Sequence, residues 1–279
     1  MVQSAVTAAA LPTRERGIVH LTAGRTHGPI TRLMSPGDLG ELVKPFVFLD
    51  YFEAPSSGGP PMADHPHSGI ATHTTLLQGS VGYRDSTGKS GTLRAGSVEW
   101  MQAGGGVWHG GDMRPGEPVR GYQLWVALPA HLELEPAFSQ YLDPDAIETD
   151  GRVRVLLGSH GKLRSPIADV SPLAYLHVRL HDGEAWRFQP PADHEVAWLA
   201  VSAGRLHVAG TVVARRLAVF EEGNGALEVR AEGPTEFVLG SAAKHPHSLV
   251  CGYYSVHTSE RALVLGEDGI QKVARARRS

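Results

Sequence analysis

The chain is broken by turn residues about every ten positions, and this spacing favours a fold built from short strands. It holds 33 glycines and 19 prolines in 279 residues, about a fifth of the chain against about 12% in average proteins. The runs between these residues are apolar or alternate, as in Leu176-His177-Val178-Arg179-Leu180. Such a pattern is typical of β-sandwiches and barrels. We therefore expect an all-β protein.

The rhythm of the strands divides the chain into two halves. In the first half we expect strands at residues 46–49, 70–77, 81–85, 91–93, 97–101, 107–111 and 121–128. Residues 129–150 are rich in acids and prolines, and they indicate a linker with a short helical turn at 137–141. Strand-like runs resume after Val153. We predict two domains of one architecture, 1–135 and 136–279.

Composition excludes several classes of protein. The formal net charge is −3 and the pI about 6.6, which argues against nucleic acid as a partner. No run is long enough to span a membrane, and the Ala-rich residues 1–11 indicate a flexible terminus rather than a secretory signal. The single cysteine, Cys251, rules out an internal disulfide and favours the cytoplasm. We expect Cys251 to be buried, and the basic residues 272–279 to form a solvated tail.

The strongest candidates for binding a metal ion are a pair of histidines and a third histidine further along the chain. His65 and His67 are two residues apart in Asp64-His65-Pro66-His67-Ser68-Gly69, so on a strand both rings face one side. His109 ends a strand-like run that follows the turn Gly104-Gly105-Gly106. Three imidazoles so placed can close on one metal ion. The glycines precede a strand rather than a helix, which indicates a tight turn and argues against a phosphate site.

The same motifs resemble the pirin family of the cupin superfamily. The resemblance rests on Asp64 to Gly69, on Tyr83-Arg84-Asp85-Ser86-Thr87-Gly88, on Ala95-Gly96-Ser97-Val98-Glu99-Trp100-Met101 with Ala103-Gly104, on Val107-Trp108-His109, and on Leu124-Trp125, Leu128-Pro129 and Glu135-Pro136. It covers residues 20–140 and continues loosely to about 260. It implies two tandem cupin barrels, of the β-sandwich or jelly-roll type. The first barrel would hold one divalent non-haem metal, commonly iron; the second would have lost its metal.

The resemblance assigns His65, His67 and His109 as metal ligands. Its fourth ligand, a glutamate two positions after the third histidine, is replaced by Gly111, and the alternative cupin glutamate position holds Ala71. Three arrangements follow: three histidines with water in the open positions, a substitute ligand from Asp112 or His73, or an empty site. A neutral three-histidine site leaves the ion its full charge and lets nickel, zinc or copper compete with iron.

Three functions are open at this point. The resemblance implies a quercetin 2,3-dioxygenase acting on a flavonoid-like molecule, with Gly111 weakening the chemistry. It also implies the alternative of a metal-dependent regulator that binds a protein partner without catalysis. A metal-free cupin that binds or modifies a small ligand is the third. We expect the pair His245-Pro246-His247 to be a loop pair without a structural ion. The aromatic residues are expected in the core or lining the cavity: Trp100, Trp108, Trp125, Phe46, Phe48 and Phe52.

Overall fold

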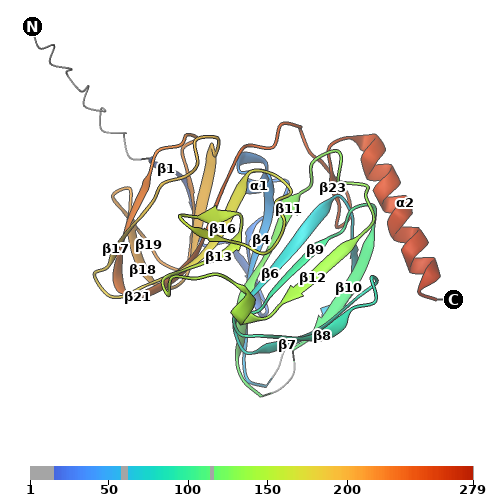
Figure 1. Cartoon of the computed structure of the whole chain (residues 1–279), viewed down its shortest axis with the longest axis horizontal. Helices are drawn as coiled ribbons and strands as arrows, with labels where there is room; N and C mark the ends of the chain where they lie inside the picture. The colour runs from blue at the N-terminus through green and yellow to red at the C-terminus, as the bar shows by residue number, and fades with distance from the viewer. Residues whose placement is uncertain (1–15, 58–61, 114–115, 279) are drawn as a thin grey trace, which may run out of the picture.

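Two β-lobes lie side by side, and a single long helix runs along the outer side of the first lobe in the computed structural model (Figure 1). The structure describes residues 16–57, 62–113 and 116–278. The predicted flexible terminus, residues 1–11, lies outside these ranges. Among the described residues, no helix is long and apolar enough to cross a bilayer. The all-β prediction is confirmed.

The first lobe is a sandwich of two antiparallel sheets. Its elements are β2 (Arg25–His27), β3 (Ile30–Met34), α1 (Leu39–Leu42), β4 (Phe46–Ala54), β5 (Met62–His67), β6 (Ile70–Gln78), β7 (Ser80–Asp85), β8 (Ser90–Arg94), β9 (Val98–Gln102), β10 (Val107–Asp112), β11 (Val119–Ala127) and β12 (Phe138–Leu142). The larger sheet runs β12-β9-β6-β11-β4-β3-β2 and the smaller β5-β10-β7-β8. Each expected strand of the first half is present.

The second lobe is built on one large sheet. Its elements are β1 (Ile18–Thr22), the 3-10 turn η1 (Pro144–Ala146), β13 (Val153–Leu157), β14 (Ser159–His160), β15 (Leu163–Arg164), β16 (Leu173–Leu180), β17 (Ala185–Phe188), β18 (Val196–Val208), β19 (Thr211–Val213), β20 (Leu217–Phe220) and β21 (Leu227–Ala242). The elements that follow along the chain, β22 (Val250–Cys251), β23 (Val256–His257) and α2 (Glu260–Ala276), lie beside the first lobe (Figure 1). The sheet runs β1-β20-β18-β21-β16-β13, with β17 beside β21 and β19 beside β18.

Both ends of the chain cross between the lobes. Strand β1 pairs with β20 in the second lobe, although it comes first in the sequence. In the opposite direction, the chain beyond residue 249 returns to the first lobe, where the indole Nε1 of Trp108 on β10 donates to the Ile270 carbonyl of α2 at 3.1 Å. The division of the chain after residue 135 stays a prediction.

Two expectations about local structure were wrong, those for residues 137–141 and for Cys251. Residues 137–141 were expected to form a helical turn, but β12 occupies 138–142 and pairs with β9, because Tyr141 stacks on Tyr83 of β7 at 3.6 Å. The basic residues of the expected solvated tail are exposed in the described part of the chain, and residues 272–276 belong to α2, whose N-terminus is capped by the Ser259 hydroxyl accepting from the Ala262 amide at 3.2 Å. Cys251 is exposed, since it lies on the short two-stranded ladder β22–β23 and not in a core sheet.

The lobes share an apolar core. The strands of the first lobe's larger sheet contribute Phe46 and Tyr122, and the second lobe contributes Tyr175 and Trp198; all four side chains are buried in one cluster. Phe46 and Trp198 meet edge to face with ring centroids 5.5 Å apart. A contact of this kind adds about 0.5–1.5 kcal/mol beyond the area buried. The two lobes are therefore joined by a continuous cluster of buried apolar side chains.

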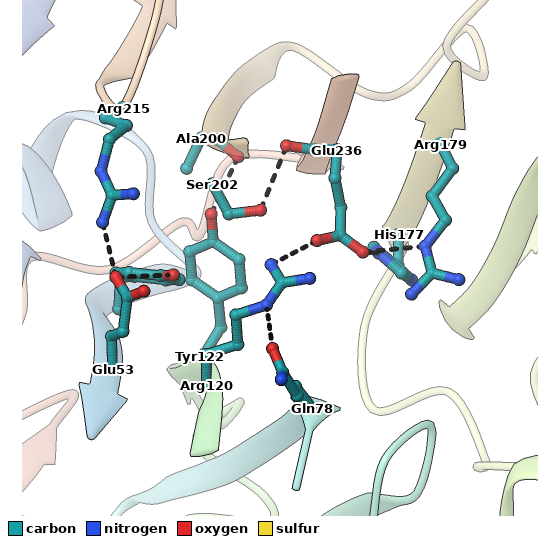
Figure 2. A network of polar contacts seen from close by, with 11 residues as sticks. Glu53, Gln78, Arg120, Tyr122, His177, Arg179, Ala200, Ser202, Arg215 and Glu236 are labelled. Carbon is teal, nitrogen blue, oxygen red and sulfur yellow. Dashed lines mark hydrogen bonds and ion pairs between the residues drawn. The ribbon is translucent and has the colours of Figure 1, made fainter. Parts of the chain in front are cut away.

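A buried polar network borders this core (Figure 2). The carboxylate of Glu236, on β21, accepts from Arg120 of the first lobe at 2.5 Å and from Arg179 of its own lobe at 2.8 Å. It also accepts from the buried His177 at 3.0 Å. Nearer the surface, Arg215 reaches across to Glu53 at 2.6 Å. Because the donors come from both lobes, Glu236 ties them together.

The glycine-rich turn predicted before β10 is the docking surface for α2. A side chain on Gly269 of the helix would overlap the carbonyl oxygen of Gly105, so the two backbones are in direct contact. Gly106, with a φ of 146°, lies against the backbone of Ile270. The turn is tight, as expected, and its glycines admit a helix backbone, since only residues without a Cβ allow so close an approach.

Candidate metal centre

Three histidines converge inside the first lobe. Strands β5 and β10 pair antiparallel, with His109 opposite His65 and Val107 opposite His67. Residues directly opposite in such a pair share a face of the sheet, and so do residues two apart on one strand. The Nε2 atom of His109 accordingly lies 3.0 Å from that of His65 and 3.1 Å from that of His67. The predicted ligand set is thus brought together.

Each imidazole is held from behind through its other nitrogen. Nδ1 of His65 faces the Ala63 carbonyl at 2.9 Å, and Nδ1 of His67 faces the Tyr254 carbonyl at 3.1 Å. Nδ1 of His109 lies 3.4 Å from Oε1 of Glu99. A carbonyl oxygen can only accept, so the hydrogen bonds of His65 and His67 place the proton on Nδ1 and leave the Nε2 lone pairs of these two rings pointing inward. Metal-binding histidines are characteristically oriented in this way.

The residues fit a divalent ion. Two nitrogens that each lie about 2.1 Å from one ion are about 3.0 Å apart when their bonds to it meet at a right angle, and about 3.4 Å at the tetrahedral angle. The two Nε2–Nε2 separations of 3.0 and 3.1 Å match the right angle. Burial, with the neighbouring His109, lowers the pKa of His65 to about 4, and burial lowers that of the fully enclosed His67 well below its usual value. Unprotonated imidazoles are the form that binds metal.

Neither family position for a carboxylate ligand can supply one. A Cβ on Gly111 would overlap the carbonyl oxygen of Gly82 on the neighbouring β7, so the strands leave no room for a side chain there. Ala71 on β6 is buried in the core between the lobes and so faces away from the histidines. The backbone geometry at Gly111 therefore excludes the fourth, carboxylate ligand of the family pattern.

The two substitute ligands considered from the sequence lie elsewhere. His73 was one of the two possible substitute ligands, but the chain turns at Gly69 and His73 belongs to a different strand, β6. Its ring packs against Tyr175 of the second lobe at 5.2 Å. The carboxylate of Asp112 lies over the backbone of Gly82. Neither belongs to the histidine group, whose donor atoms all lie within 4.8 Å of one another.

Glu99 is the site residue that sequence reasoning missed. It lies on β9 and is 5% exposed, with Oε2 accepting from the Thr74 hydroxyl at 2.5 Å. Thr74 is directly opposite Glu99 in the β6–β9 pair. A lone glutamate in the otherwise apolar strand Val98-Glu99-Trp100-Met101 was the available signal, since a buried carboxylate needs a partner.

Aromatic rings surround the histidines. Trp125 meets His67 edge to face at 4.8 Å and stacks on Phe48 at 4.0 Å. Tyr254, which is 37% exposed, places its ring 5.4 Å from that of His65. Its backbone has a φ of 61°, a left-handed conformation that costs a residue with a side chain about 1–3 kcal/mol. The aromatic lining expected from the sequence is present, with Tyr254 added from the far end of the chain.

A second buried cluster supports the site from outside. The Ser68 hydroxyl lies 2.9 Å from Nε2 of His257, whose Nδ1 lies 3.1 Å from a carboxylate oxygen of Glu133. All three are buried beneath α2, where Gly266 leaves room for them. This cluster fixes the residue after His67. By contrast, His245 and His247 form a loop pair, with both ring nitrogens of His245 facing backbone atoms.

Known proteins share this architecture. A Pirin family profile matches residues 29–126. A pirin-like protein from Caulobacter vibrioides is 32% identical over 229 residues, covering 77% of this chain and 79% of that protein. Quercetin 2,3-dioxygenase from Acinetobacter baumannii superposes with a TM-score of 0.83 at 24% identity, over 92% of this chain and 97% of the other. The nickel(II) complex of the bacterial pirin YhhW from Escherichia coli gives 0.61 at 20%, over 84% and 97%. The predicted fold of two tandem cupin barrels is confirmed.

Proposed function

The chain belongs to the pirin family, and from this membership and its converging histidines we propose a metal-dependent oxidoreductase of the quercetin 2,3-dioxygenase type. The observation that carries the proposal is the meeting of the Nε2 atoms of His65, His67 and His109 at 3.0 and 3.1 Å. Imidazole suits iron, nickel, copper and zinc. We propose Fe(II) as the ion, with Ni(II) the closest competitor, since a relative is known as a nickel(II) complex.

The ion would supply an electrophilic centre for an anionic oxygen of the substrate and for its oxidation by dioxygen. With three neutral imidazole ligands the ion would keep a net positive charge, so an anion such as a deprotonated flavonol is the favoured ligand class. Trp125 and Tyr254 offer apolar walls to a flat ring and exclude water from the histidines. With no carboxylate at Gly111 to accept the flavonol proton, turnover should be slow and should rise with pH as more flavonol ionises.

The test is aerobic oxygen uptake with quercetin by protein loaded with Fe(II) or Ni(II). The proposal expects uptake above that of His109→Ala, which loses one of three ligands and should bind the ion far more weakly. The controls are metal-free protein and His207→Ala, which removes an exposed histidine of the second lobe. Absence of oxygen uptake with both metals would refute the catalytic part. Failure of the wild-type chain to bind either metal would refute the whole proposal.

A second function, metal-dependent regulation through a protein partner, is favoured by one observation. The segment that carries the Tyr254 carbonyl also exposes large apolar side chains: Tyr253 is 75% exposed, and Val264 and Leu265 of α2 are 59% and 46% exposed. This function would be supported by a protein partner whose binding is abolished when the metal is removed by a chelator, and also by the substitution Tyr253→Ser. For either function we propose the cytoplasm as the compartment, because a lone exposed thiol persists in reducing conditions.

A further inference from the structure

We propose that Glu99 is the carboxylate of this metal site and acts on the ion through His109 rather than as a ligand. The inference rests on the proposed metal binding and names a positioning residue for it. In the family pattern, a glutamate beside the third histidine would bind the ion directly. Here Gly111 removes that group, and a negative charge is found on the far side of His109 instead.

The first support is the placement of the carboxylate. Oε1 of Glu99 lies 3.4 Å from Nδ1 of His109, the nitrogen that does not face the other histidines. Its other oxygen is fixed by the Thr74 hydroxyl at 2.5 Å, on the adjacent strand of a regular antiparallel pair. The carboxylate is thus held by two strands of the larger sheet against a ligand carried by the smaller one. Carboxylate, histidine and metal in this order are a recurrent arrangement that makes the imidazole a stronger donor.

The second support is the balance of buried charge. Glu236 is buried to a similar degree and is compensated by two arginines and a histidine. Glu99 is 5% exposed, and its hydrogen bond and ion pair among the described residues go to a hydroxyl and an imidazole. A buried carboxylate without a cation costs several kcal/mol. A divalent ion on the opposite nitrogen of His109 supplies the missing positive charge.

The third support is that the arrangement restores the charge of the family site. Three histidines with one carboxylate ligand reduce a divalent ion to a net charge of +1. A carboxylate behind His109 gives the same net charge of +1 for the ion and its surroundings. It also leaves one more coordination position of the ion open to substrate or water. The change from a ligand carboxylate to Gly111 is therefore compatible with tight metal binding, because the carboxylate of Glu99 lies behind His109.

The test measures metal affinity directly. Apoprotein is titrated with Ni(II) against a chromophoric chelator, and the d–d absorption of the Co(II) form is recorded. Glu99→Gln keeps an acceptor for the His109 proton but removes the charge, and should weaken Ni(II) binding about tenfold; Glu99→Leu removes both and should weaken it about 100-fold. Both variants should shift the Co(II) bands, because the donor strength of His109 changes.

The matched control is Glu236→Gln, which alters another buried glutamate–histidine pair, on strands of the second lobe. It should lower the melting temperature while leaving Ni(II) affinity and the Co(II) spectrum unchanged. Should the Glu99 variants fail to fold, Thr74→Val frees the carboxylate without touching a ligand and should give a smaller loss of affinity in the same direction. Wild-type affinity and spectrum in these variants overturn the inference and leave the proposed function standing. A wild-type chain that binds no metal overturns both.

Discussion

Removing the carboxylate of Glu236 should weaken the joint between the two lobes (Figure 2). In Glu236→Ala three donors lose their acceptor. Arg179 is 59% exposed and returns to water at little cost, whereas Arg120 is 23% exposed and His177 1%. Breaking a buried ion pair by removing one partner costs about 3–5 kcal/mol. Because Arg179 is exposed, we expect the loss of unfolding free energy to lie at the lower end of this range, at about 3 kcal/mol. For a chain of this size, such a loss lowers the melting temperature by about 6–12 °C.

The effect should depend on pH in a defined direction. Burial would raise the pKa of Glu236, but the hydrogen bonds from His177 and Arg179 and the charge of Arg120 outweigh it and hold that pKa below its ordinary value of 4.5. A depressed carboxyl pKa stabilises the fold above the unfolded-state value, and this contribution is lost as the pH falls below 4.5. The difference in stability between wild type and Glu236→Ala should therefore be constant from pH 8 to 6 and shrink below pH 4.5.

Thermal unfolding followed by circular dichroism at several pH values measures this difference. The control is Glu228→Ala, which breaks the exposed pair with Arg187 in the same lobe, at 64% and 56% exposure. Exposed pairs of this kind contribute at most about 1 kcal/mol. Equal losses in the two variants would refute the assigned role of Glu236, and so would a Glu236→Ala deficit that persists unchanged at pH 3.5.

Three further substitutions test the architecture of the site. Gly111→Glu should destabilise the fold by about 1–3 kcal/mol, because its Cβ overlaps the Gly82 backbone, and should not tighten Ni(II) binding; denaturant unfolding and metal titration check this, and tighter binding would contradict it. Gly269→Ala should displace α2 from Gly105 and shift the fluorescence of Trp108, whereas Val264→Ala on the exposed side of α2 should not. His73→Phe should leave metal affinity unchanged, while His109→Ala should reduce it strongly; a loss in His73→Phe would return that residue to the ligand set.

Much of the metal site could be predicted from local sequence. The two-residue spacing of His65 and His67 fixes a common face on any strand, and the antiparallel register then places His109 opposite His65. The positions of the strands could be predicted from the spacing of turn residues and from the alternation of apolar and polar side chains. The missing ligand at Gly111 was also readable in the sequence. Only the structure shows that Gly82 excludes a side chain there.

The rest depended on contacts between residues distant in the chain. Glu99 gains its role from Thr74 and His109, on two other strands. β12 forms because Tyr141 stacks on Tyr83, although acids and prolines dominate the surrounding segment. Helix α2 was missed because its interior glycines lower helix propensity. Gly269 is nevertheless required where the helix meets Gly105, since a side chain would separate the two backbones.

The end of the chain completes the site that the first barrel begins. The Tyr254 carbonyl holds Nδ1 of His67, and His257 and Ser255 hold the hydroxyl of Ser68. Tyr254 does this in a left-handed backbone conformation, which costs about 1–3 kcal/mol and persists only where surrounding contacts impose it. Across the turn that contains Tyr254, the Gly252 amide donates to the Ser255 carbonyl at 2.9 Å and the Ser255 hydroxyl donates to the Tyr253 carbonyl at 3.3 Å. The geometry of one metal-binding imidazole is therefore determined by residues more than 180 positions later in the sequence, so the second half of the chain contributes to the metal centre without ligating it.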